Sequence, residues 1–379
     1  MRPHIVAAGA LAVAISVLNP SGPLAQAAAT AAAPASADRL ALPAPKAGRS
    51  RPLVVVVAEN LGAETTDFTI PYGVLKASGV ADVRSLSTAP GPIKLRMSLK
   101  VVADQTLAEF DAAEPRGADI IIVPAQASPK APGLTAWVQA QAAKGATVVS
   151  VCEGARVLAN AGLLKGRRAT THWSAMEGLT KAYPETTWVR DRRYVQDGRI
   201  ISTTGVTASI PMSLALVEAI GGRVAAEATA REFGVADWSA AHRSADFQLR
   251  KGDLSAGVKA VAAVWTHETV EAPISDGVDE VALALRTDAW SRSYRTKVVT
   301  THRGGAPVRS RRGLTILPDA VARPGRYVIP GDAGPAAPQL DAALAAMDRR
   351  YGPKAVRLAT LGLEYDAPAT AVANAQRRP

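Results

Sequence analysis

Short apolar runs alternate with stretches of helical periodicity through the first two thirds of the chain. The runs are rich in β-branched residues and almost free of charge: Leu53–Ala58, Val83–Ser87, Asp119–Val123 and Thr147–Val151. Continuous runs of this kind are typical of strands buried on both faces of a parallel sheet. Helical spacing follows, most clearly after Gly154, where apolar residues recur three and four positions apart up to Leu164. The pattern favours an open α/β sheet, in which ligands bind at the carboxyl ends of the strands.

Cys152 is the only cysteine, and the pattern places it between the strand Thr147–Val151 and the following helix. A helix N-terminus offers unpaired N–H groups and a partial positive charge, which favour thiolate over thiol by up to about 2 kcal/mol, or roughly one to one and a half pKa units. Gly154, two residues later, is expected to let the turn pass close to neighbouring backbone. The sequence therefore predicts a thiolate that is substantially populated at neutral pH. An ionised carboxylate close to the sulfur would oppose this shift, and the pair would then share one proton, held either by the acid or by the thiol.

Three segments around this turn resemble the ThiJ/PfpI family of the class I glutamine amidotransferase-like superfamily. They are Cys152-Glu153-Gly154-Ala155, Ala161-Gly162-Leu163-Leu164 and Arg167-Arg168-Ala169-Thr170-Thr171-His172-Trp173. In motif they are most similar to isocyanide-hydratase-like and GlxA-type amidase-like domains. The resemblance runs from about Pro52 to Trp238. It implies a flavodoxin-like parallel sheet sandwiched by helices, with a reactive cysteine at the elbow.

The resemblance also implies two partners for Cys152. Family members carry a carboxylate four residues before a proline, and Asp67 stands in that relation to Pro71. The alternative is that Asp67 only caps its helix, a common role for aspartate in a first turn. His172 follows Cys152 at the family's spacing of twenty residues, and the alternative for it is a structural histidine. Ser174 and Glu177 match a capping box for the next helix.

The remaining candidate pocket residues include two departures from the family pattern. Relatives have Pro-Gly-Gly where this chain has Pro124, Ala125 and Gln126, and a backbone N–H of that turn helps form the oxyanion hole. If the turn requires positive φ, alanine and glutamine adopt it less readily than glycine. Glu153 replaces the threonine of hydratase-like relatives. The other candidates are Gly154 at the elbow and the pair Gly205 and Val206, at a Gly-rich helix entry.

The last third of the chain repeats the family pattern in part. Strands are expected at Ala260–Trp265 and Lys297–Thr301, and helices at Leu340–Tyr351 and Val356–Tyr365. No cysteine turn occurs among them. The sequence thus predicts a ThiJ/PfpI-like domain over residues 51–240 and, over 241–379, a degenerate second α/β unit that lacks the nucleophile elbow.

The N-terminus has the features of an export signal. Arg2 and His4 precede the apolar run Ile5–Leu18, and Ala25-Gln26-Ala27 forms an A-x-A cleavage site. Residues 1–27 are therefore expected to be a signal peptide and the Ala/Pro-rich residues 28–50 a flexible linker. A periplasmic or secreted protein follows, or a membrane-anchored one if the signal is not cleaved. No later stretch suggests a transmembrane helix.

Composition narrows the range of partners. The chain has 379 residues, 48% of them hydrophobic, and a net charge of +11. The basic residues are dispersed, with no basic helix or aromatic platform, so nucleic-acid binding is not expected. One cysteine and five scattered histidines form no metal-ligand spacing, and no phosphate or dinucleotide loop occurs, so no cofactor is expected. The expected partner is a small-molecule substrate, with no membrane contact after signal cleavage, and a homodimer is left open.

These features lead to one functional prediction and two alternatives. The leading one is an exported, cysteine-dependent hydratase or hydrolase that acts on a small electrophilic substrate, with Cys152 as nucleophile, Asp67 as proton donor and acceptor, and His172 assisting. The first alternative is a non-catalytic redox-sensing or ligand-binding protein of the same fold. A transcription regulator is disfavoured by the export signal and by the absence of a helix-turn-helix segment.

Overall fold

The computed structural model describes residues 39–96, 98–250, 252–253, 257, 267–331 and 333–366. The predicted signal peptide, the first part of the predicted linker and the predicted strand Ala260–Trp265 lie outside the described residues. The described residues, from Arg39 to Asp366, belong to one compact unit. The end of the predicted linker is packed against it, because Leu40 is buried and the Arg49 guanidinium pairs with Glu114 at 2.8 Å and Asp119 at 2.9 Å. The prediction of a flexible tether up to Ser50 is therefore wrong for this stretch.

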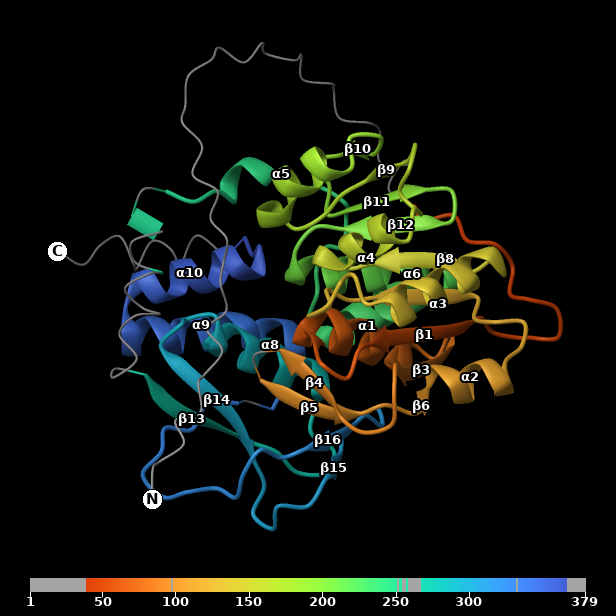
Figure 1. The fold of residues 1–379 in the computed structure, drawn as a ribbon. Coiled ribbons are helices and arrows are strands. Elements are labelled where there is room, and N and C mark those ends of the chain that lie inside the picture. Colours follow the sequence, from red (N-terminus) through yellow and green to blue (C-terminus); the bar gives the residue numbers. More distant parts are fainter. Residues whose placement is uncertain are drawn as a thin grey trace, which may run out of the picture. The chain divides into compact units, whose positions relative to one another are not determined.

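A seven-stranded sheet forms the centre of the first two thirds (Figure 1). Its order is β11-β12-β8-β7-β1-β3-β6, and all neighbouring pairs are parallel except β11 with β12. The strands are β1 (Leu53–Ala58), β3 (Asp82–Ser87), β6 (Gln105–Thr106), β7 (Ile120–Val123), β8 (Thr147–Ser150), β11 (Tyr194–Asp197) and β12 (Ile200–Thr203). The chain has the mixed α/β, flavodoxin-like fold that the sequence predicts, with an additional C-terminal region.

Helices cover both faces of this sheet, as the continuous apolar runs require. Along β1, Leu53, Val55 and Val57 pack toward one helical layer, while Val54 and Val56 pack toward the other, because successive side chains of a strand point to opposite faces. The first layer contains α2 (Leu107–Ala113), α3 (Pro132–Ala143), α4 (Ala155–Asn160) and α5 (Trp173–Ala182). The second contains α1 (Thr65–Ser78) and α6 (Ser209–Phe233).

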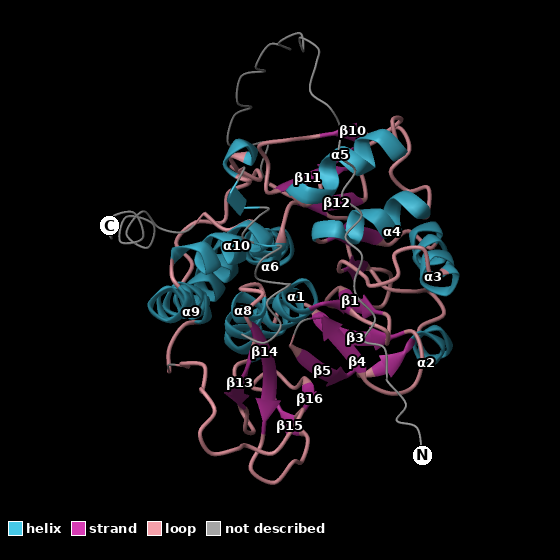
Figure 2. Cartoon of the chain, turned by 60° about the vertical axis from the view of Figure 1, so that its left-hand side comes forward, coloured by secondary structure: helices cyan, strands magenta, loops and turns pink. Residues whose placement is uncertain are grey.

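Helix α6 is kinked near its middle, because Gly222 has φ 82° and ψ 172° inside the otherwise helical stretch. By length and composition Val206–Phe233 could also cross a membrane, and 56% of its most apolar window is buried within the protein. Its packing against α1 is that of a core helix (Figure 2).

The last third of the chain repeats the order of the first elements. Strand β13 (Glu268–Pro273), helix α8 (Glu280–Ser291), strand β14 (Thr296–Thr301) and the hairpin of β15 (Val308–Arg309) and β16 (Thr315–Leu317) follow one another as β1, α1, β3 and the hairpin of β4 (Ile93–Arg96) and β5 (Leu99–Val102) do. Strands β13 and β14 pair in parallel, as β1 and β3 do. Helices α9 (Ala336–Tyr351) and α10 (Pro353–Leu363) complete this region, close to the predicted helices.

This region shares its sheet and its core with the first two thirds. Strand β16 pairs antiparallel with β5, which joins the two hairpins and β2 (Ala63–Glu64) in a five-stranded sheet of order β15-β16-β5-β4-β2. A separate two-stranded sheet pairs β9 (Arg168–Ala169) with β10 (Thr187–Trp188). Helix α8 packs on α1, and one apolar cluster includes Phe68 of α1, Val281 of α8 and Leu344 of α9. The C-terminal region is thus built against the helix that follows β1.

Candidate active site around Cys152

Cys152 lies at a sharp turn between β8 and α4. Its φ is +57°, a left-handed conformation that is uncommon for a non-glycine residue, and it begins a short 3-10 turn that ends at Gly154. The Cys152 N–H donates to Thr203 Oγ1 at 3.1 Å, and its carbonyl accepts from Thr171 Oγ1 at 3.1 Å. Only 5% of the residue is exposed. Hydrogen bonds from two neighbouring segments therefore hold the strained elbow that the sequence predicts.

Glycine is required at position 154 because the turn passes close to the backbone at the end of β7, as expected. A Cβ placed on Gly154 would lie 2.1 Å from the carbonyl oxygen of Val123, at the end of β7. Real Cβ atoms do not come this near to backbone oxygen, so no other residue fits without moving the turn away from β7.

Asp67 is completely buried in the first turn of α1. The N-cap of this helix is Glu64, whose Oε2 accepts from the Asp67 N–H at 2.7 Å, so the capping role considered for Asp67 belongs to Glu64 instead. Asp67 Oδ2 accepts from the N–H of Ala125 at 3.1 Å. Its other oxygen, Oδ1, is buried and has no hydrogen-bond partner among the described residues. Such an atom is available to a proton or a ligand.

Ala125 and Gln126 form the turn at the end of β7 without positive φ, so glycine is not needed there. The Gln126 side chain is buried and satisfied: Oε1 accepts from the Glu59 N–H at 3.0 Å, and Nε2 donates to the carbonyls of Val57 and Pro124. The Ala125 N–H is already bonded to Asp67. The turn therefore has a structural role in this conformation. The Ala125 N–H can bind an oxyanion only if its hydrogen bond to Asp67 is broken.

Burial and charge act against a thiolate at Cys152. Burial raises the pKa of the Cys152 thiol well above its ordinary value, and the negative charges of Asp67, Glu153 and Glu64 raise it further. The predicted downward shift is wrong in direction, because the sulfur is desolvated and faces carboxylates, and these effects exceed that of a helix of only six residues. Burial and the charge of Glu64 likewise raise the pKa of Asp67. Both groups of the pair therefore favour their protonated forms.

A buried arginine from the C-terminal region offsets part of this negative charge. Arg292, at the end of α8, pairs with Glu64 at 2.9 Å and with Asp288 at 2.9 Å. Burial alone would lower the pKa of Arg292, but Asp288 and Glu64 raise it, so the guanidinium stays charged. Its charge also acts to lower the pKa of Cys152. Sequence analysis missed Arg292, since nothing in the run Trp290–Arg292 distinguishes it from a surface arginine.

His172 has a structural role at one ring nitrogen. It is the N-cap of α5, where Nδ1 accepts from the Ser174 N–H at 3.3 Å and lies 2.7 Å from Ser174 Oγ. The capping box predicted for Ser174 and Glu177 is therefore wrong, because the helix begins two residues earlier than that motif requires. Ser174 Oγ also contacts Glu153 Oε1 at 3.4 Å. His172 Nε2 is buried and without a hydrogen-bond partner in the described part of the chain.

Glu153 turns away from the sulfur toward its own helix. Its Oε2 accepts from Arg156 Nε at 2.6 Å. Burial would raise the pKa of Glu153, but the charge and hydrogen bond of Arg156 lower it, so the carboxylate is ionised at neutral pH. Glu153 therefore holds no proton for the sulfur at neutral pH.

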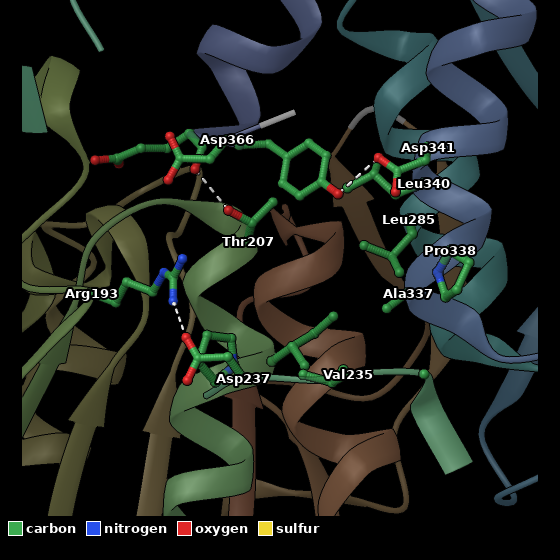
Figure 3. Close-up of a pocket in the computed structure, with 15 residues that line it drawn as sticks. Arg193, Thr207, Val235, Asp237, Leu285, Ala337, Pro338, Leu340, Asp341 and Asp366 are labelled. Atoms are coloured by element: carbon green, nitrogen blue, oxygen red, sulfur yellow. Dashed lines mark hydrogen bonds and ion pairs between the residues drawn. The ribbon is translucent and has the colours of Figure 1, made fainter. Parts of the chain in front are cut away.

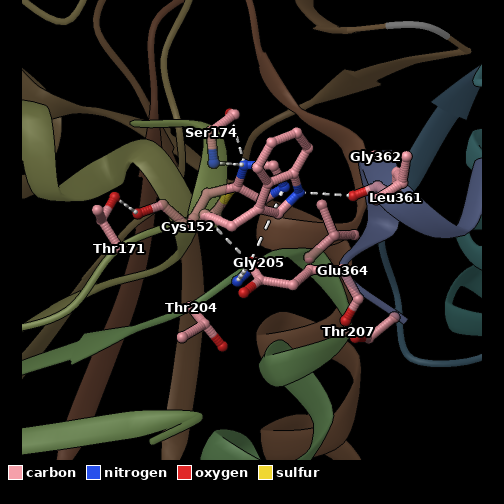
Figure 4. Close-up of polar contacts among 12 residues, drawn as sticks. Cys152, Thr171, Ser174, Thr204, Gly205, Thr207, Leu361, Gly362 and Glu364 are labelled. Carbon is pink, nitrogen blue, oxygen red and sulfur yellow. Dashed lines mark hydrogen bonds and ion pairs between the residues drawn. The ribbon is translucent and has the colours of Figure 1, made fainter. Parts of the chain in front are cut away.

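Gly205 and Val206 are buried at the entry to α6. Glu364, a second residue that sequence analysis missed, lies beside Gly205. Glu364, just after α10, accepts from the Gly205 N–H at 2.6 Å and lies 3.9 Å from His172 Nε2 (Figure 4). A Cβ on Gly205 would be 2.4 Å from the Glu364 Cβ, so glycine is required here. The Val206 side chain is buried in the apolar core cluster.

A cavity of about 250 Å³ lies on the other side of Glu364 (Figure 3). Its walls combine apolar side chains with Asp341, which accepts from Tyr365 at 2.8 Å, and Asp237, which pairs with Arg193 at 3.7 Å. The lining does not include Cys152, Asp67 or His172. Elsewhere, no group of three or more His, Cys, Asp or Glu side chains placed to hold a metal ion occurs among the described residues.

Comparison with known proteins identifies the family. The profile of the DJ-1/PfpI family matches residues 53–219. The deglycase PfpI of Pyrococcus furiosus is 30% identical over 144 residues, which cover 37% of this chain and 82% of that protein. The chain belongs to the DJ-1/PfpI family.

Other relatives within the DJ-1/PfpI family differ in activity. Isonitrile hydratase of Pseudomonas putida is 42% identical over 88 residues, which cover 23% of this chain and 36% of that protein. The HTH-type transcriptional regulator CdhR of Pseudomonas aeruginosa is 33% identical over 135 residues, covering 35% of this chain and 38% of that protein. The chain thus spans little more than a third of these two relatives. A solved DJ-1 superfamily structure from Salmonella typhimurium is 26% identical and covers 49% of this chain and all of that one, with a TM-score of 0.44.

Proposed function

We propose that this DJ-1/PfpI family member is a cysteine-dependent hydratase or hydrolase that acts on a small electrophilic substrate. The observation that carries the proposal is the buried pair of Cys152, strained at φ +57°, and Asp67, whose free oxygen Oδ1 lacks a partner. Perturbed acids in such a pair are typical of catalytic sites. The similarity to isonitrile hydratase supports the same reading.

The resting state would hold a neutral thiol beside a neutral carboxyl group. When an electrophilic carbon enters, the sulfur–carbon bond forms and the S–H bond breaks. For an isonitrile the proton passes through the Asp67 carboxyl to the attacked carbon itself, which leaves a C=N double bond in a thioimidate. Water then adds across this C=N bond, with its hydroxyl on the carbon and its proton on the nitrogen. The carbon–sulfur bond breaks as a C=O bond forms, and the hydroxyl proton returns to the sulfur and restores the thiol. For an isonitrile the net change would be the addition of one water molecule.

The test is turnover of small isonitriles, aldehydes and thioesters by the wild type and by Cys152→Ser, Asp67→Asn and Asp82→Asn. General acid–base catalysis typically contributes about 10²–10⁴-fold, so Asp67→Asn should lose activity by that factor and Cys152→Ser should lose all of it. Asp82 is exposed on β3 and pairs with Arg51, so its variant should keep full activity. A wild type that converts none of these compounds, with a thiol that iodoacetamide reaches only after unfolding, would leave Cys152 a structural residue.

Redox sensing by Cys152 is the alternative, and the structure gives it less support. Oxidation follows thiolate character and exposure. Burial raises the pKa of this thiol and leaves only 5% of the residue exposed. Fast, reversible loss of the thiol in dilute peroxide, without turnover of any electrophile, would favour this alternative.

We also propose export, on the basis of the apolar run Ile5–Leu18 and the cleavage site Ala25-Gln26-Ala27. N-terminal sequencing of the protein from its native host should then begin near Ala28. Recovery of the full-length chain from the cytoplasm alone would contradict the proposal.

A further inference from the structure

The C-terminal end of α10 lies against the Cys152 site, although it falls outside the residues matched by the family profile (Figure 4). The indole N–H of Trp173 donates to the Leu361 carbonyl at 2.8 Å, and Arg292 donates to the Gly362 carbonyl at 2.7 Å. Thr207 Oγ1 donates to the Glu364 carbonyl at 2.7 Å. Three hydrogen bonds to carbonyl groups within four consecutive residues hold this segment in place.

These bonds position the Glu364 side chain, which is buried with 4% exposure of the residue. The backbone of Glu364 has φ +52°, which a residue with a side chain adopts only when its surroundings impose it. Oε2 accepts from the N–H groups of Gly205 at 2.6 Å and Trp173 at 3.2 Å, and Oε1 contacts His242 Nε2 at 2.9 Å. A carboxylate with this many donors is well satisfied as an anion.

The hydrogen bonds of His172 define where its proton lies. Nδ1 accepts the Ser174 N–H at 3.3 Å as the cap of α5, an arrangement that places the proton of a neutral ring on Nε2. Nε2 is buried and makes no hydrogen bond of normal length to the described residues; it lies 3.9 Å from Glu364 Oε2, and the Gly362 backbone also acts to raise the pKa of the ring. A proton on Nε2 therefore lies near a buried negative charge.

We propose that Glu364 is a positioning residue for His172: it keeps the proton of the neutral ring on Nε2 and stabilises the imidazolium when Nδ1 takes up a second proton. The inference rests on the proposed function, because this protonation matters only if His172 assists a reaction at Cys152. The carboxylate comes from the additional C-terminal region, so the family domain alone would lack it.

The other charges around His172 come from three elements. Burial lowers the pKa of His172, Glu364 and Glu153 oppose this effect, and Arg292 adds to it. Glu153 reaches the ring through Ser174 Oγ, on the Nδ1 side. Glu364 acts on the Nε2 side, so the contributions of the two carboxylates can be separated by substitution.

The experiment is an NMR titration of the imidazole nitrogens in ¹⁵N-histidine-labelled full-length protein, with His172→Gln used to assign the signal. Removing an opposite charge within about 4–6 Å shifts a pKa by about one unit or more, so Glu364→Gln should weaken proton binding to His172 by about tenfold or more. Glu364→Asp keeps the charge and should restore part of the effect. Glu177→Gln, on the exposed face of α5, should leave the titration unchanged.

The pH profile of turnover gives the second readout. In Glu364→Gln, any activity limb that depends on protonated His172 should move to lower pH, by the same amount as the NMR titration. A His172 titration equal to that of the wild type in both Glu364→Gln and Glu364→Asp would overturn the inference. Because the NMR readout needs no substrate, it tests Glu364 even if Cys152 turns over none of the compounds, an outcome that would reject only the proposed function.

Discussion

At Cys152 the strained turn and the buried charges have opposite effects on reactivity. The turn presents the sulfur at the carboxyl end of β8, whereas burial and the negative charges of Glu153 and Glu64 raise the pKa of the thiol, as an ionised Asp67 also would. Attack on a substrate then has to be coupled to movement of the thiol proton. A neutral Asp67 carboxyl with a free oxygen is suited to that task, since it can donate and accept in one step.

The pKa of Asp67 has a measurable consequence for stability. Because its pKa is raised in the folded protein, the unfolded chain loses this proton first, near pH 3.9. The stability contributed by this group is present below that pH and is lost as the pH rises toward the folded pKa. We measure the free energy of unfolding by urea denaturation. We expect that of Asp67→Asn to rise relative to that of the wild type as the pH increases from 4.5 to 8. The exposed Asp82→Asn should give a curve parallel to the wild type, and parallel curves for Asp67→Asn would contradict the raised pKa.

Gly154 offers a second prediction. A methyl group on this residue would meet the Val123 carbonyl, so Gly154→Ala should lower the free energy of unfolding by about 1–3 kcal/mol, the usual cost of overpacking. It should also slow alkylation of Cys152, since the elbow must move. Gly178→Ala is the matched control: Gly178 lies in α5 with open space around its Cα, and alanine there should stabilise by up to about 1 kcal/mol. Equal stability of the two variants would be inconsistent with the close approach.

Residues that act through local chain geometry were the ones that the sequence could predict. The position of Cys152, the need for glycine at 154 and the placement of Asp67 in the first turn of a helix follow from short motifs. The pKa direction of Cys152 did not, because it depends on burial and on carboxylates that are distant in sequence. Arg292 and Glu364 were missed for the same reason: they reach the site through tertiary packing, in a region where the resemblance is weak.

At the scale of elements, α1 is held between α6 and α8. Gly73 lets α1 and α8 cross closely, since a Cβ there would be 2.5 Å from a methyl group of Val281. Arg292 at the end of α8 then reaches the N-cap Glu64 of α1. Strand and helix positions were largely predictable, because apolar periodicity is local. The pairing of β5 with β16 was not, since nothing in strands of four and three residues specifies a partner so far along the chain.

The buried ion pairs of Arg292 should matter more than an exposed one. Arg292→Met leaves Glu64 and Asp288 without their cation, and breaking a buried pair costs about 3–5 kcal/mol of unfolding free energy. Lys181→Met removes an exposed pair with Glu177 on α5 and should cost less than about 1 kcal/mol. Urea unfolding at pH 7 measures both. A loss for Arg292→Met no larger than that of the control would mean that the pair does not hold α8 to α1.

At the scale of the whole molecule, the shared core predicts a single cooperative unfolding transition. Phe68 of α1 and Leu344 of α9 belong to one apolar cluster, so neither region can expose its side of the core alone without losing the contacts of the other. With ¹⁹F-labelled tryptophan, Trp137 in α3 and Trp290 in α8 should report the same midpoint in urea. A Trp290 signal that is lost well before that of Trp137 would show that the C-terminal region unfolds as a separate unit.

The pairing of Val101 with Ile316 also sets an order of events during synthesis. More than two hundred residues separate the two strands, and at about 5–20 residues per second the ribosome needs roughly 10–40 seconds to make them. Throughout that interval β5 is an unpaired edge, and the side of α1 that α8 will cover is bare. Glu364 is synthesised later still, so His172 lacks its neighbouring carboxylate for longer than β5 lacks β16. The nascent chain therefore depends on being shielded from its neighbours until the region from β13 to Glu364 has been made.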